Sequence, residues 1–470
     1  MLKILSSFLA ERKQRVIIDG NFSSWAEIEA GVPQGSILGP ILFLVYINDL
    51  IDEVNSEIRI FADNTFIFRI VDQNSTENLN RDLEKITDWA SKWKMVFNPS
   101  ITKQAVEVSF SNKRTPSTFE ILDFNGIPVM QASDTKHLGM ILDSKLDFKK
   151  HLAEKIGKAN QGLGVMKQLC KWVPRRSLEE IYKLYVRPHL DYGDIIYDIA
   201  DINKTSIFTD TTSNLQMEKI EIVQYQAAKI VTGAWQGTSR VKLYEDLGWE
   251  SLQNRRTVRK LCILFETQKN NYPLYLADIL NNYKYRQNSR HFDRQMLKNI
   301  PCRTNKFKAT CFPSAIRDWN LLSFETKNAV SKQAFKNKIL KLTRPPKKSY
   351  FGLLDKKKSK YITLLRMELS PLRAHKFKYN FNNTEDPFCS VCETVEDTKH
   401  FLLHCRSYRL TRVDLIQSVS NILTNFSNLP QKMKFNILLY GNEQLDMQQN
   451  KKILEEVGNF ILKSKRLDVY

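Results

Sequence analysis

Three cysteines and a histidine near the end of the chain have the spacing of metal ligands. Two residues separate Cys389 from Cys392, seven residues then precede His400, and four more precede Cys405. Zinc binds thiolate and imidazole ligands in a tetrahedron, and a C-x2-C turn supplies two thiolates from one short loop. The pattern predicts a structural Zn²⁺ site in which all four positions are filled, so hydrolytic zinc chemistry is not expected. His404 is an alternative to His400 as ligand, and three buried thiols with a chance histidine are the alternative to a metal site.

A second candidate site is a carboxylate at the tip of a predicted β-hairpin. Residues 57–70 are rich in β-forming side chains on either side of Asp63 and Asn64. A two-residue turn there pairs Ala62 with Thr65. Both faces of such a hairpin are largely apolar, so we expect packing on both sides and a tip that projects the carboxylate.

The segment before this hairpin, residues 31–50, reads GVPQGSILGPILFLVYINDL. Its glycines allow the backbone to approach a ligand or a strand closely. Taken alone, a strand–loop–helix packing element explains the segment. Its position just ahead of the hairpin favours a different interpretation.

Together these motifs resemble the reverse transcriptases of non-LTR retrotransposons, LINE-type elements of the jockey-like group in particular. The palm of that family carries G-V-P-Q-G-S-x-L-G-P shortly before a hairpin tipped by F/Y-A-D-D. This chain has GVPQGSILGP at 31–40 and FADN at 61–64. Further matching blocks are WASKW at 89–93, FNP at 97–99, HLGMILDSKLDFKKHL at 137–152, RPHLDYG at 187–193, LGWESLQNRR at 247–256, FPSAIRDWN at 312–320 and HFLLHC at 400–405.

The resemblance implies RNA-directed DNA synthesis by a two-metal-ion mechanism. In the family, three aspartates hold two divalent cations such as Mg²⁺, which prefer anionic oxygen ligands. By resemblance, Asp63 is the first aspartate of the hairpin tip. Pro33, Gln34, Gly35 and Ser36 match the segment that lines the template–nucleotide pocket. RNA, DNA or both are the implied partners, and the sequence does not indicate an oligomeric state.

The sequence departs from the family at this site. Asn64 stands where the family has a second aspartate, and Ile101 stands where relatives have the lysine proposed to protonate pyrophosphate, although Lys103 is nearby. The family's remaining metal-binding aspartate lies upstream of the GVPQG block, and this sequence starts too late to include it or the fingers. We therefore expect an N-terminally truncated, degenerate pseudoenzyme that does not bind Mg²⁺ productively.

The family activity itself, extension of a primer on an RNA template, stays a hypothesis that GVPQGSILGP and Asp63 support. Two further alternatives to the inactive polymerase remain. The first is a non-catalytic nucleic-acid-binding protein that uses a basic surface and the CCHC zinc module. The second is a translated remnant that folds poorly, because a palm sheet without partner strands exposes an edge.

The composition favours a polyanionic partner and a reducing compartment. The 470 residues include 71 Lys and Arg against 51 Asp and Glu, a formal charge of +20. Each cation that neutralises a phosphate releases counterions on binding, although an ordinary basic bias is the alternative on charge alone. Seven cysteines with one tight cluster indicate reduced thiols rather than disulfides, and hence cytoplasm or nucleus. The longest apolar run, residues 37–47, is too short for a membrane-spanning helix, and a signal peptide is not expected.

The hydrophobic patterns predict an α+β fold. We expect a partial reverse-transcriptase palm and following strands at 1–150, with an antiparallel sheet and helices. An α-rich, thumb-like connector follows at 151–343, then a basic, exposed linker at 344–360. The C-terminal region at 361–470 contains the CCHC module.

Several local elements follow from the same patterns. Apolar spacing predicts a helix at 79–93 that ends before Asn98-Pro99. Turns are expected at 125–126 and 143–144. A capping box at 177–180 predicts a helix start there, and Pro188 is expected to stop or kink that helix.

Overall fold

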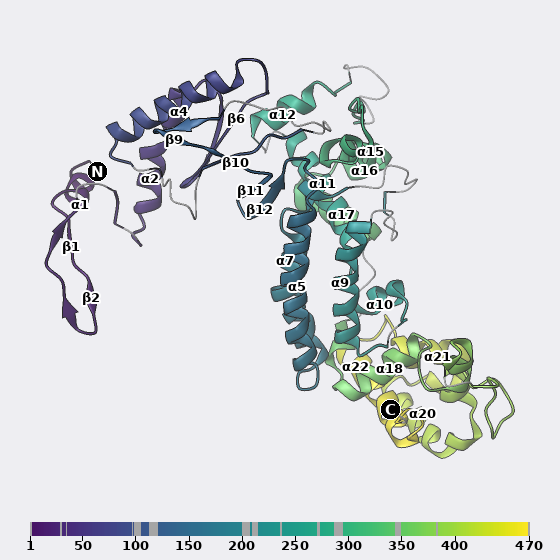
Figure 1. The fold of residues 1–470 in the computed structure, drawn as a ribbon. Coiled ribbons are helices and arrows are strands. Elements are labelled where there is room, and N and C mark those ends of the chain that lie inside the picture. The colour runs from purple at the N-terminus through teal and green to yellow at the C-terminus, as the bar shows by residue number, and fades with distance from the viewer. Residues whose placement is uncertain are drawn as a thin grey trace. The chain divides into compact units, whose positions relative to one another are not determined.

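The computed structural model describes most of the chain. The described residues are 2–28, 31–33, 35–95, 97, 105–111, 121–199, 207–208, 215–235, 237–269, 273–285, 295–343, 349–381 and 384–468. They divide into two compact units, Met1–Phe148 and Lys149–Tyr470. The first mixes short strands with helices and the second is helical (Figure 1). A mixed helix-and-sheet architecture was the expectation.

Strands of the first unit pair into two-stranded sheets within its described residues. The pairs are β1 (Lys13–Gln14) with β4 (Ala26–Glu27), β2 (Ile17–Ile18) with β3 (Asn21–Phe22), β5 (Glu57–Phe61) with β6 (Asn64–Phe68), β7 (Val106–Glu107) with β10 (Met130–Gln131), β8 (Asp123–Phe124) with β9 (Ile127–Pro128), and β11 (Asp134–His137) with β12 (Met140–Asp143). All are antiparallel except the parallel pair of β7 and β10.

A small core joins three helices of the first unit to the β5–β6 hairpin, and the first helix of the chain contributes no buried residue to it. The helices are α1 (Leu2–Leu9), α2 (Gly39–Ile47), α3 (Leu50–Glu53) and α4 (Ser75–Lys92). Ile86, Trp89 and Ala90 share one face of α4 and pack with Leu50 and Ile58. The helix predicted around residues 79–93 is confirmed. It begins at Ser75, and its last helical residue is Lys92.

Both predicted turns are present, but only the first connects two paired strands. Asn125 and Gly126 have positive φ angles and connect β8 to β9. The chain also turns after Asp143, where Ser144 and Lys145 form a turn and the amide of Leu146 donates to the carbonyl of Asp143 at 2.8 Å. Leu138 and Gly139 are the residues that connect β11 to β12. Asp143 ends β12, and its carboxylate accepts hydrogen bonds from the backbone amides that follow it.

The second unit consists of helices, and Figure 1 shows the long helices α5 and α9 side by side. Its helices are α5 (Lys149–Leu169), α6 (Arg175–Ile181), the π-helix η1 (Tyr182–Val186), α7 (Arg187–Asp191), α8 (Asp194–Tyr197), α9 (Leu215–Thr232), α10 (Arg240–Leu247), α11 (Leu252–Gln268), α12 (Leu274–Asn281), α14 (Asn305–Lys308), α15 (Cys311–Leu321), α16 (Phe324–Lys327), α17 (Lys332–Thr343), η2 (Ser349–Leu353), α18 (Lys356–Arg366), α19 (Arg373–Lys378), η4 (His400–His404), η5 (Arg406–Tyr408), α20 (Arg409–Ile422), η6 (Phe426–Asn428), α21 (Gln431–Tyr440) and α22 (Met447–Ser464).

Helix α6 begins earlier than the capping-box pattern predicted. Pro174 is the N-cap residue, so Ser177 lies inside the helix and the predicted start there is wrong. Pro188 does disturb the following helix as expected. Since proline has no amide hydrogen to donate, the hydrogen-bond pattern widens into the π-helix η1 before α7 resumes.

The stretch predicted as an exposed linker is folded wherever the structure describes it. Residues 344–348 lie outside the described residues, but 349–353 form η2 and α18 begins at Lys356. The Asp355 side chain caps α18 by accepting from the amide of Lys357. Apolar residues between the lysines, including Phe351, are buried. The high charge of the segment favoured the prediction of an exposed linker over this burial.

A buried carboxylate on α10 joins two arginines from distant parts of the second unit. Asp246 lies 2.7 Å from Nη2 of Arg175 on α6 and 3.0 Å from Nη1 of Arg366 on α18. All three side chains are almost fully buried. Burial alone raises the pKa of the Asp246 carboxyl, but the two guanidinium groups outweigh it and the pKa falls below its ordinary value.

We expect Asp246→Ala to destabilise the protein by about 3–5 kcal/mol, because it leaves two buried guanidinium groups without their carboxylate. Urea denaturation followed by circular dichroism measures the change. Glu180→Ala is the matched control, since it removes an exposed partner of Arg176 and should cost less than about 1 kcal/mol. Equal effects of the two variants would contradict the prediction.

Candidate polymerase hairpin and metal centre

The β5–β6 hairpin turns one residue earlier than predicted. Phe61 pairs with Asn64, so the turn consists of Ala62 and Asp63, and the predicted pairing of Ala62 with Thr65 is wrong. Ala62 has a φ of 51°, which a tight hairpin turn requires. The partner of each residue therefore shifts by two positions along the opposite strand. Because side chains alternate between the two faces of a strand, each side chain keeps its predicted face.

Only one face of this hairpin is well covered. Ile58 is 5% exposed and packs against the core of the first unit, with Ile60 and Ile67 beside it. On the other face, Phe61 is 63% exposed and Phe68 is also exposed. Phe66 on this second face is half-buried, with its ring 4.9 Å from that of His137. Among the described residues, the expectation of packing on both sides therefore holds for one side and only in part for the other.

The hairpin tip presents Asp63 and Asn64 next to each other in solvent. Both side chains are exposed, and Nδ2 of Asn64 donates a hydrogen bond of 3.4 Å to Oδ1 of Asp63. The amide of Asn64 adds no negative charge to the tip beside the Asp63 carboxylate. Within the described ranges, Asp63 does not join any group of three or more acidic, histidine or cysteine ligands.

The loop of the GVPQG block is held by one serine. Oγ of Ser36 donates to the carbonyl of Pro33 at 2.7 Å and accepts from the amide of Gly39 at 3.0 Å. A Cβ at position 39 would lie 3.0 Å from Oγ of Ser36 and 3.1 Å from the carbonyl oxygen of Pro33, so the tight turn into α2 favours glycine there. Gly35 has a φ of 82°, and Gln34 lies outside the described residues. In the parts of this loop that are described, no hydrogen bond joins it to the hairpin tip.

A buried carboxylate that sequence reasoning missed anchors the start of β5. The oxygens of Asp82 on α4 accept from the amides of Asn55 and Ser56, both at 2.9 Å. Burial raises the pKa of the Asp82 carboxyl, but these backbone hydrogen bonds outweigh it and the pKa lies below its ordinary value. The sequence feature that could have revealed Asp82 is its position one helical turn before Ile86, on the apolar face of α4.

The four C-terminal residues with ligand spacing come together. Ligand atoms of Cys389, Cys392, His400 and Cys405 all lie within 4.8 Å of one another. The sulfurs of Cys389 and Cys405 are 3.9 Å apart, close to the roughly 3.8 Å edge of a tetrahedron with zinc–sulfur bonds of about 2.3 Å. His404 is exposed and is not part of the group.

The local backbone explains why His400, and not His404, joins Cys405. Residues 400–404 form the π-helix η4, in which the amide of Cys405 donates to the carbonyl of His400 at 2.8 Å. This i to i+5 hydrogen bond places residues five apart on the same side of the helix. An ordinary α-helical turn favours spacings of three or four residues.

The histidine is oriented as a ligand. Nδ1 of His400 lies 3.1 Å from the hydroxyl of Thr394, while Nε2 is buried without a hydrogen-bond partner among the described residues. Burial lowers the pKa of His400, which favours the neutral imidazole that metals bind. The backbone amide of Arg406 donates to the sulfur of Cys392 and lowers the pKa of that thiol. The donor set, its spacing and the orphaned nitrogen fit a tetrahedral metal ion.

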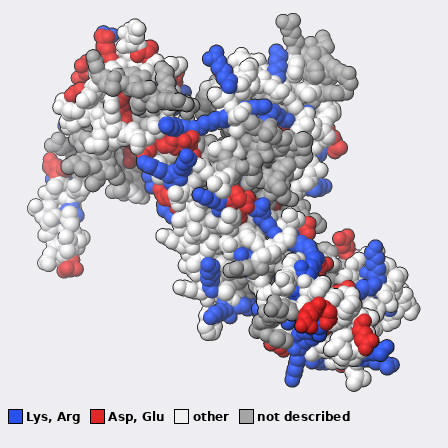
Figure 2. Space-filling model, turned by 45° about the vertical axis from the view of Figure 1, so that its right-hand side comes forward, with Lys and Arg blue, Asp and Glu red and all other residues white. Residues whose placement is uncertain are grey.

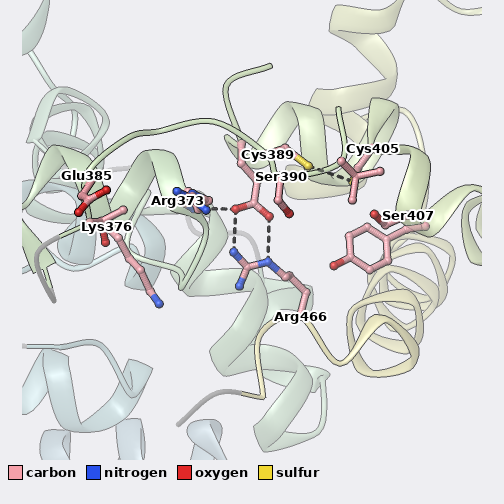
Figure 3. A pocket seen from close by; sticks show the side chains of 12 residues that line it. Arg373, Lys376, Glu385, Cys389, Ser390, Cys405, Ser407 and Arg466 are labelled. Atoms are coloured by element: carbon pink, nitrogen blue, oxygen red, sulfur yellow. Dashed lines mark hydrogen bonds and ion pairs between the residues drawn. The ribbon is translucent and has the colours of Figure 1, made fainter. Parts of the chain in front are cut away.

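A pocket of about 660 Å³ lies beside this cluster, with Cys389 in its wall (Figure 3). Arg466 donates to both carboxylate oxygens of Glu396, at 2.8 and 2.7 Å. Arg373 pairs with Asp386 at 2.7 Å. Both arginines therefore have carboxylate partners. The pair of Arg466 and Glu396 links the C-terminal segment to residues near the Cys/His cluster.

Basic side chains do not form one continuous stripe on the face shown in Figure 2. Lysines and arginines gather there in separate patches, with uncharged and acidic side chains between them. All seven cysteines are free thiols. Among the described helices, none combines the length and the apolar character required to cross a bilayer.

Comparisons with known proteins identify relatives of the chain. Residues 2–142 match the family described as reverse transcriptase (RNA-dependent DNA polymerase). The chain is 30% identical over 248 residues to the RNA-directed DNA polymerase from mobile element jockey of Drosophila melanogaster, covering 49% of this chain and 25% of that protein. It is 28% identical over 251 residues to the jockey polymerase of Drosophila funebris, covering 50% and 25%. It is 27% identical over 255 residues to the probable RNA-directed DNA polymerase from transposon X-element of Drosophila melanogaster, covering 52% and 26%. The matched region spans about a quarter of the length of these relatives.

We expect Asp82→Asn to lower the stability of the first unit by about 1–3 kcal/mol near neutral pH, because a charged acceptor of two backbone amides is lost. The folded pKa is lowered, so the stabilisation is present above the unfolded pKa of about 3.9 and disappears as pH falls through the folded value. Thermal unfolding of the two proteins between pH 7 and pH 2 tests this. A difference that stays constant down to the lowest pH would contradict the assignment.

Proposed function

We propose that this chain, a relative of the reverse transcriptases of jockey-like non-LTR retrotransposons, binds nucleic acid but does not polymerise DNA. The single observation that supports the inactivity is the hairpin tip, where Asn64, which carries no charge, stands beside Asp63 in place of a family aspartate. Sequence similarity to RNA-directed DNA polymerases supports the choice of RNA or DNA as partner.

Electrostatics explains why the replacement matters. Two divalent cations a few ångströms apart repel each other, and in two-metal sites carboxylates offset that repulsion while they position the attacking and leaving oxygens. An amide oxygen brings no charge, and here the amide nitrogen is turned toward Asp63. Among the described residues, Asp63 belongs to no group of three or more ligands. One carboxylate at an exposed tip holds Mg²⁺ too weakly for the mechanism, since each 1.4 kcal/mol of lost transition-state stabilisation costs about tenfold in rate.

The CCHC group is proposed to hold a structural Zn²⁺ ion. Cys389 and Cys392 would bind from the C-x2-C turn, and His400 and Cys405 from the two ends of the π-helix η4. When bound, zinc supplies a crosslink between this turn and the helices that follow it. Phe401 is fully buried and its ring lies 5.3 Å from that of Phe460 on α22, so the module is also packed against the helical unit.

Exposed cations around the module support a nucleic-acid contact. Lys399, Arg406 and Arg409 are all exposed on either side of η4. Cations so placed attract a phosphate backbone irrespective of its sequence. Because none of the seven cysteines forms a disulfide and three of them are proposed zinc ligands, we propose a reducing compartment, the cytoplasm or the nucleus.

We expect the 470-residue chain to incorporate no nucleotide in a primer-extension assay on an RNA template with Mg²⁺ or Mn²⁺. Asn64→Asp restores one carboxylate and is the informative variant, and Asp63→Ala is its matched control. The same preparations should still bind the primer–template in a filter-binding assay. Incorporation by the unaltered chain that Asp63→Ala abolishes would overturn the inactivity. Absent binding would overturn the proposed function as a whole.

We expect the purified protein to carry about one zinc ion per chain, measured by elemental mass spectrometry. His400→Ala and Cys405→Ser should lose the metal and lower the melting temperature, because structural zinc contributes folding free energy. His404→Ala and Cys170→Ser should keep it, since neither side chain belongs to the cluster. Retention of zinc in His400→Ala with loss in His404→Ala would show that the ligand assignment is wrong.

A further inference from the structure

One tryptophan of the helical unit lies almost entirely in solvent. Trp172 is 84% exposed, in the loop that joins α5 to α6. The amides of Trp172 and Val173 both donate to the carbonyl of Leu169, at 2.9 and 3.1 Å, and Pro174 then begins α6. The loop backbone is therefore ordered by its own hydrogen bonds, and the indole is displayed without supporting the core.

Positive charge gathers around this indole. Residues 167–176 read KQLCKWVPRR, with four cations and no acidic residue. Lys167, Lys171 and Arg176 are exposed on the two sides of the loop. Helices α5 and α9 lie side by side, and Lys229 is in the last turn of α9. Burial and the nearby charge of Lys167 lower the pKa of Lys229, consistent with a further cation near this loop.

The partners of these cations leave most of the charge in place. Arg175 is buried and paired with Asp246, so it does not contribute to the surface. Arg176 lies 3.5 Å from Glu180 in an exposed pair, which is weak in water. Nζ of Lys229 lies 4.6 Å from the ring centre of Tyr225, a contact that keeps its charge.

We propose that the α5–α6 loop binds single-stranded nucleic acid, with Trp172 stacked on an unpaired base and Lys167, Lys171 and Lys229 holding adjacent phosphates. The inference rests on the proposed nucleic-acid binding and adds the residue that contacts a base. An exposed aromatic ring beside cations is the arrangement by which proteins bind single strands without reading sequence. A duplex hides its base faces in the stack, so the loop should prefer unpaired strands.

The alternative occupant is a membrane surface. Interfacial binding requires a broad apolar face, and in this loop Leu169 and Val173 are half-buried, which leaves one exposed aromatic ring. The similarity of the chain to RNA-directed DNA polymerases also favours nucleic acid.

The test is binding of a fluorescein-labelled, unstructured single-stranded RNA to the 470-residue chain, followed by anisotropy. Trp172→Ala should weaken binding roughly 5- to 150-fold, the effect of losing one base-stacking contact, and Trp172→Phe should retain most of the affinity. Because the side chain is exposed, both variants should keep the unaltered melting temperature. Trp25→Ala is the matched control: Trp25 is 60% exposed and lies beneath the guanidinium of Arg15, yet its loss should leave the affinity unchanged.

Salt dependence separates the stacking contact from the phosphate contacts. Trp172→Ala should leave the slope of log affinity against log salt unchanged, whereas Lys171→Gln should reduce its magnitude by about 0.7.

Five outcomes would overturn the inference. If the unaltered chain binds RNA and Trp172→Ala binds equally well, only this inference fails. If the unaltered chain does not bind, the proposed function fails with it. Stacking by Trp172 is contradicted if Trp25→Ala weakens RNA binding as much as Trp172→Ala does. It is equally contradicted if Trp172→Ala weakens binding to a blunt duplex as much as binding to the single strand. A Trp172-dependent blue shift of fluorescence with phosphatidylserine vesicles, with RNA affinity unaffected by Trp172→Ala, would assign the loop to membranes.

Discussion

The helical unit depends on the requirement that buried charges be paired. Asp246 on α10 faces Arg175, which starts α6, and Arg366, which ends α18. Removing any of these groups leaves an uncompensated charge away from water, which costs far more than an exposed pair contributes. The two arginines of this group lie next to the two segments of this unit that are proposed to bind nucleic acid and zinc. Arg175 follows the loop that displays Trp172, and Arg366, whose Nε donates to the carbonyl of Leu439, closes the helix that leads toward the CCHC module.

The two units stand in different relations to the polymerase family. In the first, a hairpin of the expected type survives with its inward face packed, but the group at its tip has changed from carboxylate to amide. Packing and ligation are independent demands: Ile58 and Ile60 hold the hairpin without regard to which side chain follows Asp63. In the second unit the ligand set is complete, and the π-helix brings His400 and Cys405 to the same side. The proposal that the chain binds nucleic acid without polymerising DNA draws on both units: on the asparagine at the hairpin tip of the first and on the Cys/His group of the second.

Particular residues show where sequence reasoning was sufficient and where it was not. The CCHC set and the helix around Trp89 were predicted correctly, because both depend on spacing along a short segment. The hairpin was predicted with the wrong register, since Asp63 and Asn64 are as suitable for the turn as Ala62 and Asp63, and packing of Ile58 on the core decides between them. Asp82 and Trp172 were missed because a carboxylate in a helix and a tryptophan in a loop read as ordinary surface and core residues.

The amino-acid sequence by itself determined the ligand types, their spacing and the replacement of aspartate by asparagine, since these are properties of neighbouring residues. Only the tertiary structure decided how the side chains of Asp63 and Asn64 lie and that His400 rather than His404 joins the cysteines. It also decided that the lysines after residue 355 belong to a helix with one buried face and not to a linker, and that Trp172 stays in solvent. The physical reason is that exposure and pairing are set by groups far apart in the chain, whose approach no local pattern encodes.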